Sequence, residues 1–205
     1  MMPIASEKRD ALFRKALRLE YFTVGYNILE AVVAIVFGRA ANSIALVGFG
    51  LDSIVESLSG MVLIWRLQRG GHVSGEEEEI VEKRAMKFVA ATFFLLGFYI
   101  LFQSVKKLAL QEIPEPSWPG IILAFLSLVI MPLLAWQKHR TGTEIRSQAL
   151  IADSKETLAC FFLSVALLLG LGSNLAFGFW QADPLVGLAI VVFLFREGWE
   201  GWHTE

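Results

Sequence analysis

Long apolar runs separated by short polar stretches dominate this sequence. Six of the runs have about the ~20 residues that a helix needs to cross the hydrocarbon core of a bilayer. They cover residues 17–38, 43–66, 85–108, 118–137, 147–172 and 180–199. Because the connecting stretches are short, the pattern predicts an all-α fold: a single transmembrane domain over residues 1–205, with six transmembrane helices and no cytoplasmic C-terminal domain.

Composition supports this prediction. Of the 205 residues, 55% are hydrophobic and only 19% are charged, whereas a soluble domain has about 25% charged residues. The N-terminus is charged and has no apolar core before a small-residue cleavage site, so we expect no cleavable signal peptide. The net charge of −2 says little about partners, and no basic stripe indicates a nucleic-acid partner. We therefore expect a multi-pass protein in contact with lipid, in the inner or plasma membrane if the source is bacterial.

The distribution of Lys and Arg predicts an orientation. Fourteen of them fall on the side that holds both termini and the loops after the second and fourth spans, Lys138 among them. Three, including Lys107, fall on the other side, and Lys155 lies within the fifth span. Since cytoplasmic loops carry an excess of Lys and Arg, both termini are predicted to be cytoplasmic.

The second predicted span contains two carboxylates, in the stretch "GLDSIVESLSG" over residues 50–60. Asp52 and Glu56 are four residues apart and share one helix face. Both fall about 14–20 Å from the outer end of the span, near the middle of a ~30 Å core. A charge at that depth costs roughly 2.5–3.5 kcal/mol, so these acids are expected to protonate, pair or bind a cation.

The fifth predicted span has a matching set, in "QALIADSKETLAC". Asp153, Glu156 and Cys160 follow one another at spacings of three and four residues, and Glu156 falls about 15 Å into the span. Lys155 can neutralise only one acid and points about 100° away from Glu156. Carboxylates and a thiolate suit a first-row divalent metal ion.

These observations predict a metal site between the second and fifth spans, with five candidate ligands: Asp52, Glu56, Asp153, Glu156 and Cys160. A structural interpretation competes with it, because a buried acid can simply pair with a neighbouring Lys or a backbone donor, and a lone cysteine is commonly an ordinary core residue. In the first span, Glu30 and Asn27 have the same two interpretations, an interhelical hydrogen bond or a role beside the cation pathway.

These motifs resemble those of the cation diffusion facilitators, a superfamily of zinc and manganese efflux transporters. Its second helix has a Ser-x-Ala-Leu start followed by two ligands four residues apart, and here residues 43–46 precede Asp52 and Glu56 in the same way. Its fifth-helix motif, Ala-Asp-x-x-His-x-x-x-Asp, aligns Glu156 with the His and Cys160 with the final Asp. Either Cys160 completes the site, or Asp153 takes its place in an all-carboxylate site. Its sixth span commonly opens with Asp-Pro, as residues 183–184 do here.

The resemblance implies a tail-less, six-helix branch of the superfamily that exports a divalent cation by alternating access with proton antiport. Zn²⁺ is the expected ion, and the oxygen-rich ligand set suits Mn²⁺ or Fe²⁺ as well. Metal and protons would compete for the same oxygens. The metal is cargo, so no cofactor is expected, and homodimerisation stays open.

Two other functions compete with metal transport. A non-transporting protein of the same fold could act as a metal-binding or regulatory subunit, because Glu and Cys replace family ligands. An intramembrane enzyme is not expected, since the chain has no nucleophile–base constellation and no HExxH motif. Metal uptake into vesicles separates the transporter from the regulatory subunit.

Overall fold

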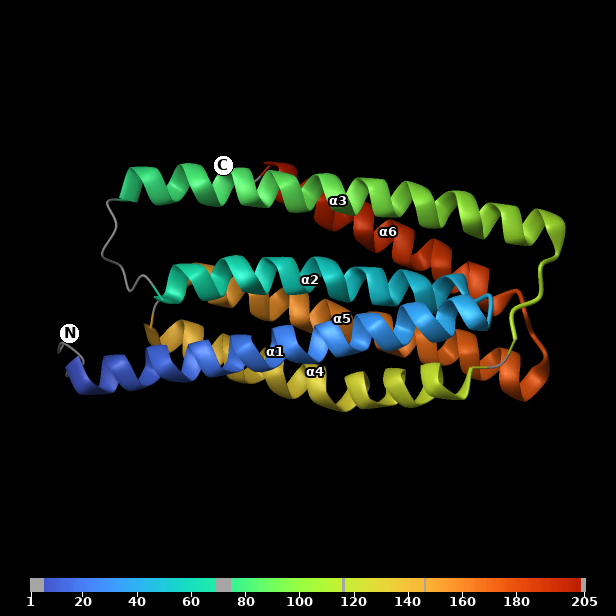
Figure 1. Ribbon diagram of the computed structural model, residues 1–205, viewed down its shortest axis with the longest axis horizontal. Helices are drawn as coiled ribbons and strands as arrows, with labels where there is room; N and C mark the ends of the chain where they lie inside the picture. Colours follow the sequence, from blue (N-terminus) through green and yellow to red (C-terminus); the bar gives the residue numbers. More distant parts are fainter. Residues whose placement is uncertain (1–5, 69–74, 116, 146, 204–205) are drawn as a thin grey trace.

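The computed structural model describes residues 6–68, 75–115, 117–145 and 147–203. Every regular element in this part of the chain is a helix (Figure 1). The helices are α1 (Ser6–Ala40), α2 (Ile44–Gln68), α3 (Gly75–Leu110), α4 (Trp118–Ile145), α5 (Gln148–Phe177) and α6 (Ala182–His203). Each of the six predicted spans lies on one of these helices, although the helix ends differ from the predicted bounds.

Five helices contain a stretch long and apolar enough to cross a membrane. These stretches are Ala11–Ala40, Ile44–Gln68, Phe93–Leu110, Trp118–Ile145 and Ala149–Phe177. Helix α6 is not among them within the described residues, so the sixth membrane span and the orientation of the termini stay predictions.

The helices form two groups (Figure 1). Helices α1, α2, α4 and α5 pack together, with the most extensive contacts between α1 and α2 and between α4 and α5. Helices α3 and α6 pack mainly on each other and lie alongside this group. The helices that carry the predicted ligands, α2 and α5, therefore belong to the four-helix group.

The distribution of side chains is inverted relative to that of a water-soluble bundle. Large apolar side chains such as Leu95, Phe162 and Val192 are exposed on the outside, while many polar and charged ones are buried between the helices. An apolar outer surface is what a bilayer requires, and buried polar groups need partners inside the protein. The interior of the four-helix group is therefore the place to look for function.

Local sequence explains where the site helices begin and end. Ser147 caps the start of α5 by accepting a hydrogen bond from the Leu150 backbone N–H at 3.3 Å. Gly178, in the left-handed region with φ 65°, ends the same helix, as glycine commonly does. Pro132 lies inside α4 without ending it, and the helix continues to Ile145, eight residues beyond the predicted span. This extension is decisive for the site because it holds Lys138.

Candidate metal site

The two predicted ligands on α2 are both buried. Asp52 is 6% exposed and Glu56 is 7% exposed. They lie one turn apart, on the face of α2 that also holds the buried Ser53 and Ser57. The Ser57 hydroxyl donates to the Ser53 carbonyl oxygen one turn earlier in the helix, whereas the Ser53 hydroxyl lies within hydrogen-bonding distance of both the Phe49 carbonyl oxygen and a carboxylate of α1.

The predicted ligands on α5 differ in their environments. Asp153 and Cys160 are buried, whereas Glu156 is partly exposed. Thr157, one turn after Asp153, is fully buried. The face of α5 that points into the four-helix group thus carries Asp153, Thr157 and Cys160.

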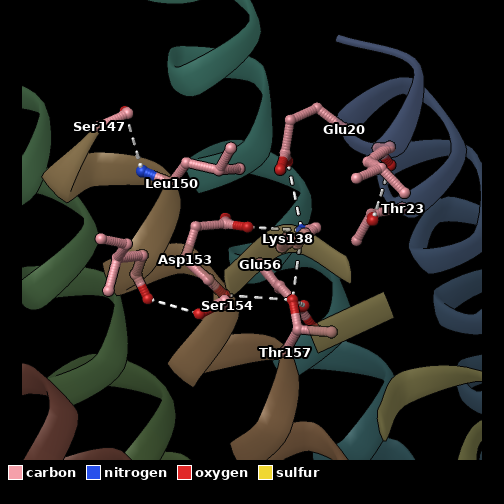
Figure 2. Close-up of polar contacts among 11 residues, drawn as sticks. Glu20, Thr23, Glu56, Lys138, Ser147, Leu150, Asp153, Ser154 and Thr157 are labelled. Atoms are coloured by element: carbon pink, nitrogen blue, oxygen red, sulfur yellow. Dashed lines mark hydrogen bonds and ion pairs between the residues drawn. The ribbon is translucent and has the colours of Figure 1, made fainter. Parts of the chain in front are cut away.

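A buried lysine occupies the space between these helices (Figure 2). Lys138 of α4 is fully buried, and its Nζ lies 2.5 Å from Asp153 Oδ2 and 3.3 Å from Glu20 Oε2 of α1. The same ammonium group donates to Thr157 Oγ1 at 3.2 Å. One cation therefore joins α1, α4 and α5, with both carboxylates turned toward it in Figure 2.

Glu56 is connected to this cluster through Thr157. The Thr157 hydroxyl donates to Glu56 Oε1 at 3.0 Å. The contacts thus run from Glu20 through Lys138 and Thr157 to Glu56, and all four helices of the group contribute a side chain (Figure 2). We call Glu20, Glu56, Lys138, Asp153 and Thr157 the Lys138 cluster.

The Lys138 cluster has more carboxylates than cations. Glu20 and Asp153 contact a single ammonium group, and Glu56 is linked to it through Thr157. Each of these carboxylates keeps one buried oxygen without a hydrogen-bond partner: Glu20 Oε1, Glu56 Oε2 and Asp153 Oδ1. Asn27, fully buried on α1, also has an unpartnered side-chain amide. Unsatisfied buried polar atoms are costly and rare in proteins, so their concentration here is typical of a site that receives a cation or protons.

Glu30 lies in a different and well-satisfied environment. Its Oε2 accepts a hydrogen bond from Ser53 at 2.7 Å, and its Oε1 accepts one from Ser127 of α4. Tyr26 extends this set through a 2.7 Å hydrogen bond with Ser127. Cys160 of α5 also reaches this set, with its Sγ 3.9 Å from Glu30 Oε2. For Glu30 the contacts match the interpretation as an interhelical hydrogen-bonding residue.

The five predicted ligands do not form a closed metal cage in this conformation. Within the described ranges, no three His, Cys, Asp or Glu side chains are grouped so that they could hold a metal ion. Asp153 is instead engaged with Lys138, and Cys160 with Glu30. The ligand set therefore stays a prediction.

Sequence reasoning missed three members of the Lys138 cluster: Glu20, Lys138 and Thr157. Lys138 was assigned to the loop after the fourth span, and this is wrong because α4 continues past it and buries it. Glu20 was not singled out because it follows the charged N-terminal arm, yet it is fully buried. The sequence offers one signal, because Lys138 and Asp153 are 15 residues apart. At this spacing, the last turns of one helix and the first turns of the next can face each other across a short connection.

A second buried ion pair lies at the opposite end of the protein. Asp183, in the first turn of α6, accepts hydrogen bonds from the Ser43 hydroxyl and from the Ile44 backbone N–H at 3.0 Å, where α2 begins. Lys107 of α3 lies 3.6 Å from Asp183 Oδ2. We call Ser43, Ile44, Lys107 and Asp183 the Asp183 cluster. Lys107 lies in the last turn of α3, within the predicted third span, and is buried.

Comparison with known proteins identifies the family. Residues 83–201, more than half of the chain, match the model of the cation efflux transmembrane domain. This chain therefore belongs to the cation efflux family, and the resemblance to the cation diffusion facilitators is confirmed. Together with the apolar helices, family membership makes it a multi-pass membrane protein.

Curated relatives are distant. Transmembrane protein 163 of Xenopus laevis is 24% identical over 90% of this chain and 65% of its own length. An uncharacterised transporter of Synechocystis is 26% identical over 79% of this chain and 53% of its own length. A cadmium, cobalt and zinc/H⁺–K⁺ antiporter of Bacillus subtilis is 22% identical over 91% of this chain and 60% of its own length. The chain spans between about half and two thirds of the length of these relatives.

Proposed function

We propose that this protein transports a divalent metal cation, exporting Zn²⁺, or Mn²⁺ or Fe²⁺, from the cytoplasm in exchange for protons. The observation that carries the proposal is the excess of buried carboxylates over buried cations in the four-helix group of a cation efflux family member. A buried carboxylate excess is stable only with protons or a cation bound, and this is the alternation that an antiporter uses.

The proposed metal site lies between α2 and α5. Asp52 and Glu56 would supply oxygens from α2, and Asp153, Glu156 and Cys160 would supply oxygens and a sulfur from α5. Both α2 acids and two of the three α5 groups are buried in the interior that the site requires. Because the predicted ligands do not yet surround one point, binding would have to draw the two helices together.

Proton exchange follows from the chemistry of the same oxygens. A carboxylate that binds a divalent cation must be deprotonated, so metal binding and protonation exclude each other at each ligand. The Bacillus subtilis relative is named as an antiporter of cadmium, cobalt and zinc, which supports a metal–proton exchange here. Both termini are proposed to be cytoplasmic, so that the N-terminal end of α1 faces the side from which the metal enters.

Metal flux into proteoliposomes loaded with a fluorescent chelator tests this function. The wild type is compared with an Asp52→Asn/Glu156→Gln variant, using Zn²⁺, Mn²⁺, Fe²⁺ and Co²⁺ with and without a proton gradient. Glu144→Gln is the matched control, because this exposed acid near the end of α4 lies outside the proposed site. We expect flux of at least one metal in the wild type and the control, and none in the double variant.

The outcomes separate the competing functions. Flux that does not depend on a proton gradient would remove antiport while keeping transport. A folded wild type that binds these metals but moves none of them would favour the metal-binding or regulatory subunit, for which the engagement of Asp153 with Lys138 is the favouring observation.

A further inference from the structure

Lys138 is a cation that the protein itself supplies at a proposed metal ligand. Its ammonium group makes the 2.5 Å contact with Asp153 Oδ2, and no part of its side chain reaches the surface. A divalent cation that binds Asp153 therefore meets a competitor of the same charge sign on the same oxygen. Two cations at contact distance repel each other strongly in a protein interior, so one of them has to move.

The neighbouring carboxylate of Glu20 offers the ammonium group an alternative position. Glu20 Oε2 is already 3.3 Å from Lys138 Nζ, and Glu20 Oε1 is buried without a partner. Glu20 lies on α1, outside the predicted ligand set of α2 and α5. A small movement of the flexible lysine side chain can exchange Asp153 for a closer contact with Glu20 without exposing the charge to lipid.

We propose that Lys138 is a tethered counter-cation that holds Asp153 in the metal-free protein and is displaced toward Glu20 when the metal binds. The inference rests on the proposed function, because it assigns a regulating partner to the proposed site. Lys138 lowers the apparent affinity for metal and keeps the empty site from collecting three unopposed negative charges. Lys138 and Glu20 are positioning residues in this scheme.

The scheme makes a prediction that simple charge counting does not. The Lys138→Met/Glu20→Gln variant has the same net charge as the wild type, so bulk electrostatics alone predicts unchanged metal affinity. A displaced counter-cation predicts tighter binding, since the metal no longer has to break the contact between Lys138 and Asp153. Glu20→Gln alone is expected to bind more weakly, because Lys138 then has no second carboxylate to move to.

Calorimetric titration of the purified proteins in detergent with Zn²⁺ and with Mn²⁺ provides the measurement. We expect Lys138→Met/Glu20→Gln to bind at least about tenfold more tightly than the wild type, the size of one charge-assisted hydrogen bond. Lys155→Met/Glu144→Gln is the matched control, because it makes the same two charge changes at exposed positions, with Lys155 on α5 only two residues from Asp153 and Glu144 near the end of α4. Its affinity is expected to stay within about twofold of the wild type.

A charge-conserving variant covers the case in which the double variant does not fold. Arginine holds a carboxylate through two parallel hydrogen bonds and gives it up less readily. Lys138→Arg is therefore expected to weaken metal binding by about tenfold at unchanged net charge.

Each result decides the matter. If the double variant binds metal no more tightly than the wild type, the proposed counter-cation role of Lys138 is overturned. Wild-type affinity in Lys138→Arg overturns it as well. Such a result leaves the proposed function in place if the wild type binds metal and transports it. A wild type that binds neither Zn²⁺ nor Mn²⁺ overturns the proposed metal site, and the counter-cation with it.

Discussion

The two buried lysines of this protein show how differently one residue type can be used. In the Asp183 cluster, one carboxylate accepts two hydrogen bonds from the start of α2 and faces Lys107, so one negative charge meets one positive charge. In the Lys138 cluster, two carboxylates contact one ammonium group, a third is linked to it through Thr157, and each of the three has one oxygen without a hydrogen-bond partner. The Asp183 cluster is balanced and the Lys138 cluster is not.

The difference separates a structural contact from a candidate site. A buried ion pair whose charges balance helps to hold helices together, and removing one partner leaves an uncompensated buried charge. An unbalanced cluster stores unfavourable electrostatic energy that a bound cation or proton can relieve. We therefore expect substitutions in the Asp183 cluster to act on stability, and substitutions in the Lys138 cluster to act on metal binding and transport.

Asp183→Ala is expected to have the largest effect on stability. It leaves Lys107 buried without its carboxylate and removes the acceptor for the Ser43 hydroxyl and the Ile44 N–H. The free energy of unfolding should fall by about 3–5 kcal/mol, the usual cost of breaking a buried ion pair. Unfolding in mixed detergent–SDS micelles measures it. A loss below about 1 kcal/mol, the size of a single neutral hydrogen bond, would contradict the structural role.

Glu56→Gln is expected to give the opposite pattern. The glutamine carbonyl can still accept the Thr157 hydrogen bond, and one of three crowded negative charges is removed. Stability should stay within about 0.5 kcal/mol of the wild type or rise, while metal flux falls at least about 100-fold because a proposed ligand is lost. A stability loss as large as that of Asp183→Ala would erase the distinction between the two clusters.

Two glycines test the clusters through packing alone. A methyl group at Gly187 of α6 would clash with the Ser104 hydroxyl and approach Ile44, which belongs to the Asp183 cluster. A methyl group at Gly60 of α2 would lie 2.7 Å from Val24 Cγ2 and 3.5 Å from Glu20 Oε2. Each Gly→Ala change should cost about 1–3 kcal/mol of stability. We expect only Gly60→Ala also to change metal affinity in calorimetric titration, since it displaces α1 next to Glu20.

Ser43→Ala is expected to have the smallest effect. The Ser43 hydroxyl donates to Asp183 and accepts from the Leu46 backbone N–H at 3.1 Å, as a residue that caps a helix does. Its loss should cost about 1 kcal/mol in the same unfolding experiment, with metal flux unchanged. Reduced flux at wild-type stability would mean that the Asp183 cluster takes part in transport and is more than a joint between helices.

The amino-acid sequence by itself determined the helices and much of the candidate site. Runs of about 20 apolar residues leave a helix as the way to satisfy the backbone in lipid, which is why the six predicted spans fall on six helices. The spacing of Asp52 and Glu56 placed two carboxylates on one face of α2, and both are buried there. The motifs of the second, fifth and sixth spans indicated the family that the comparison confirms.

Only the tertiary structure decided which charges meet. The pairing of Lys138 with Glu20 depends on how α1 and α4 pack, and no periodicity along the chain encodes contacts between helices that are distant in sequence. The same holds for the contact of Cys160 with Glu30 of α1. Hydropathy assigned Lys138 to a loop because an isolated charge is costly in lipid, and the folded protein buries it because it supplies a carboxylate as a partner.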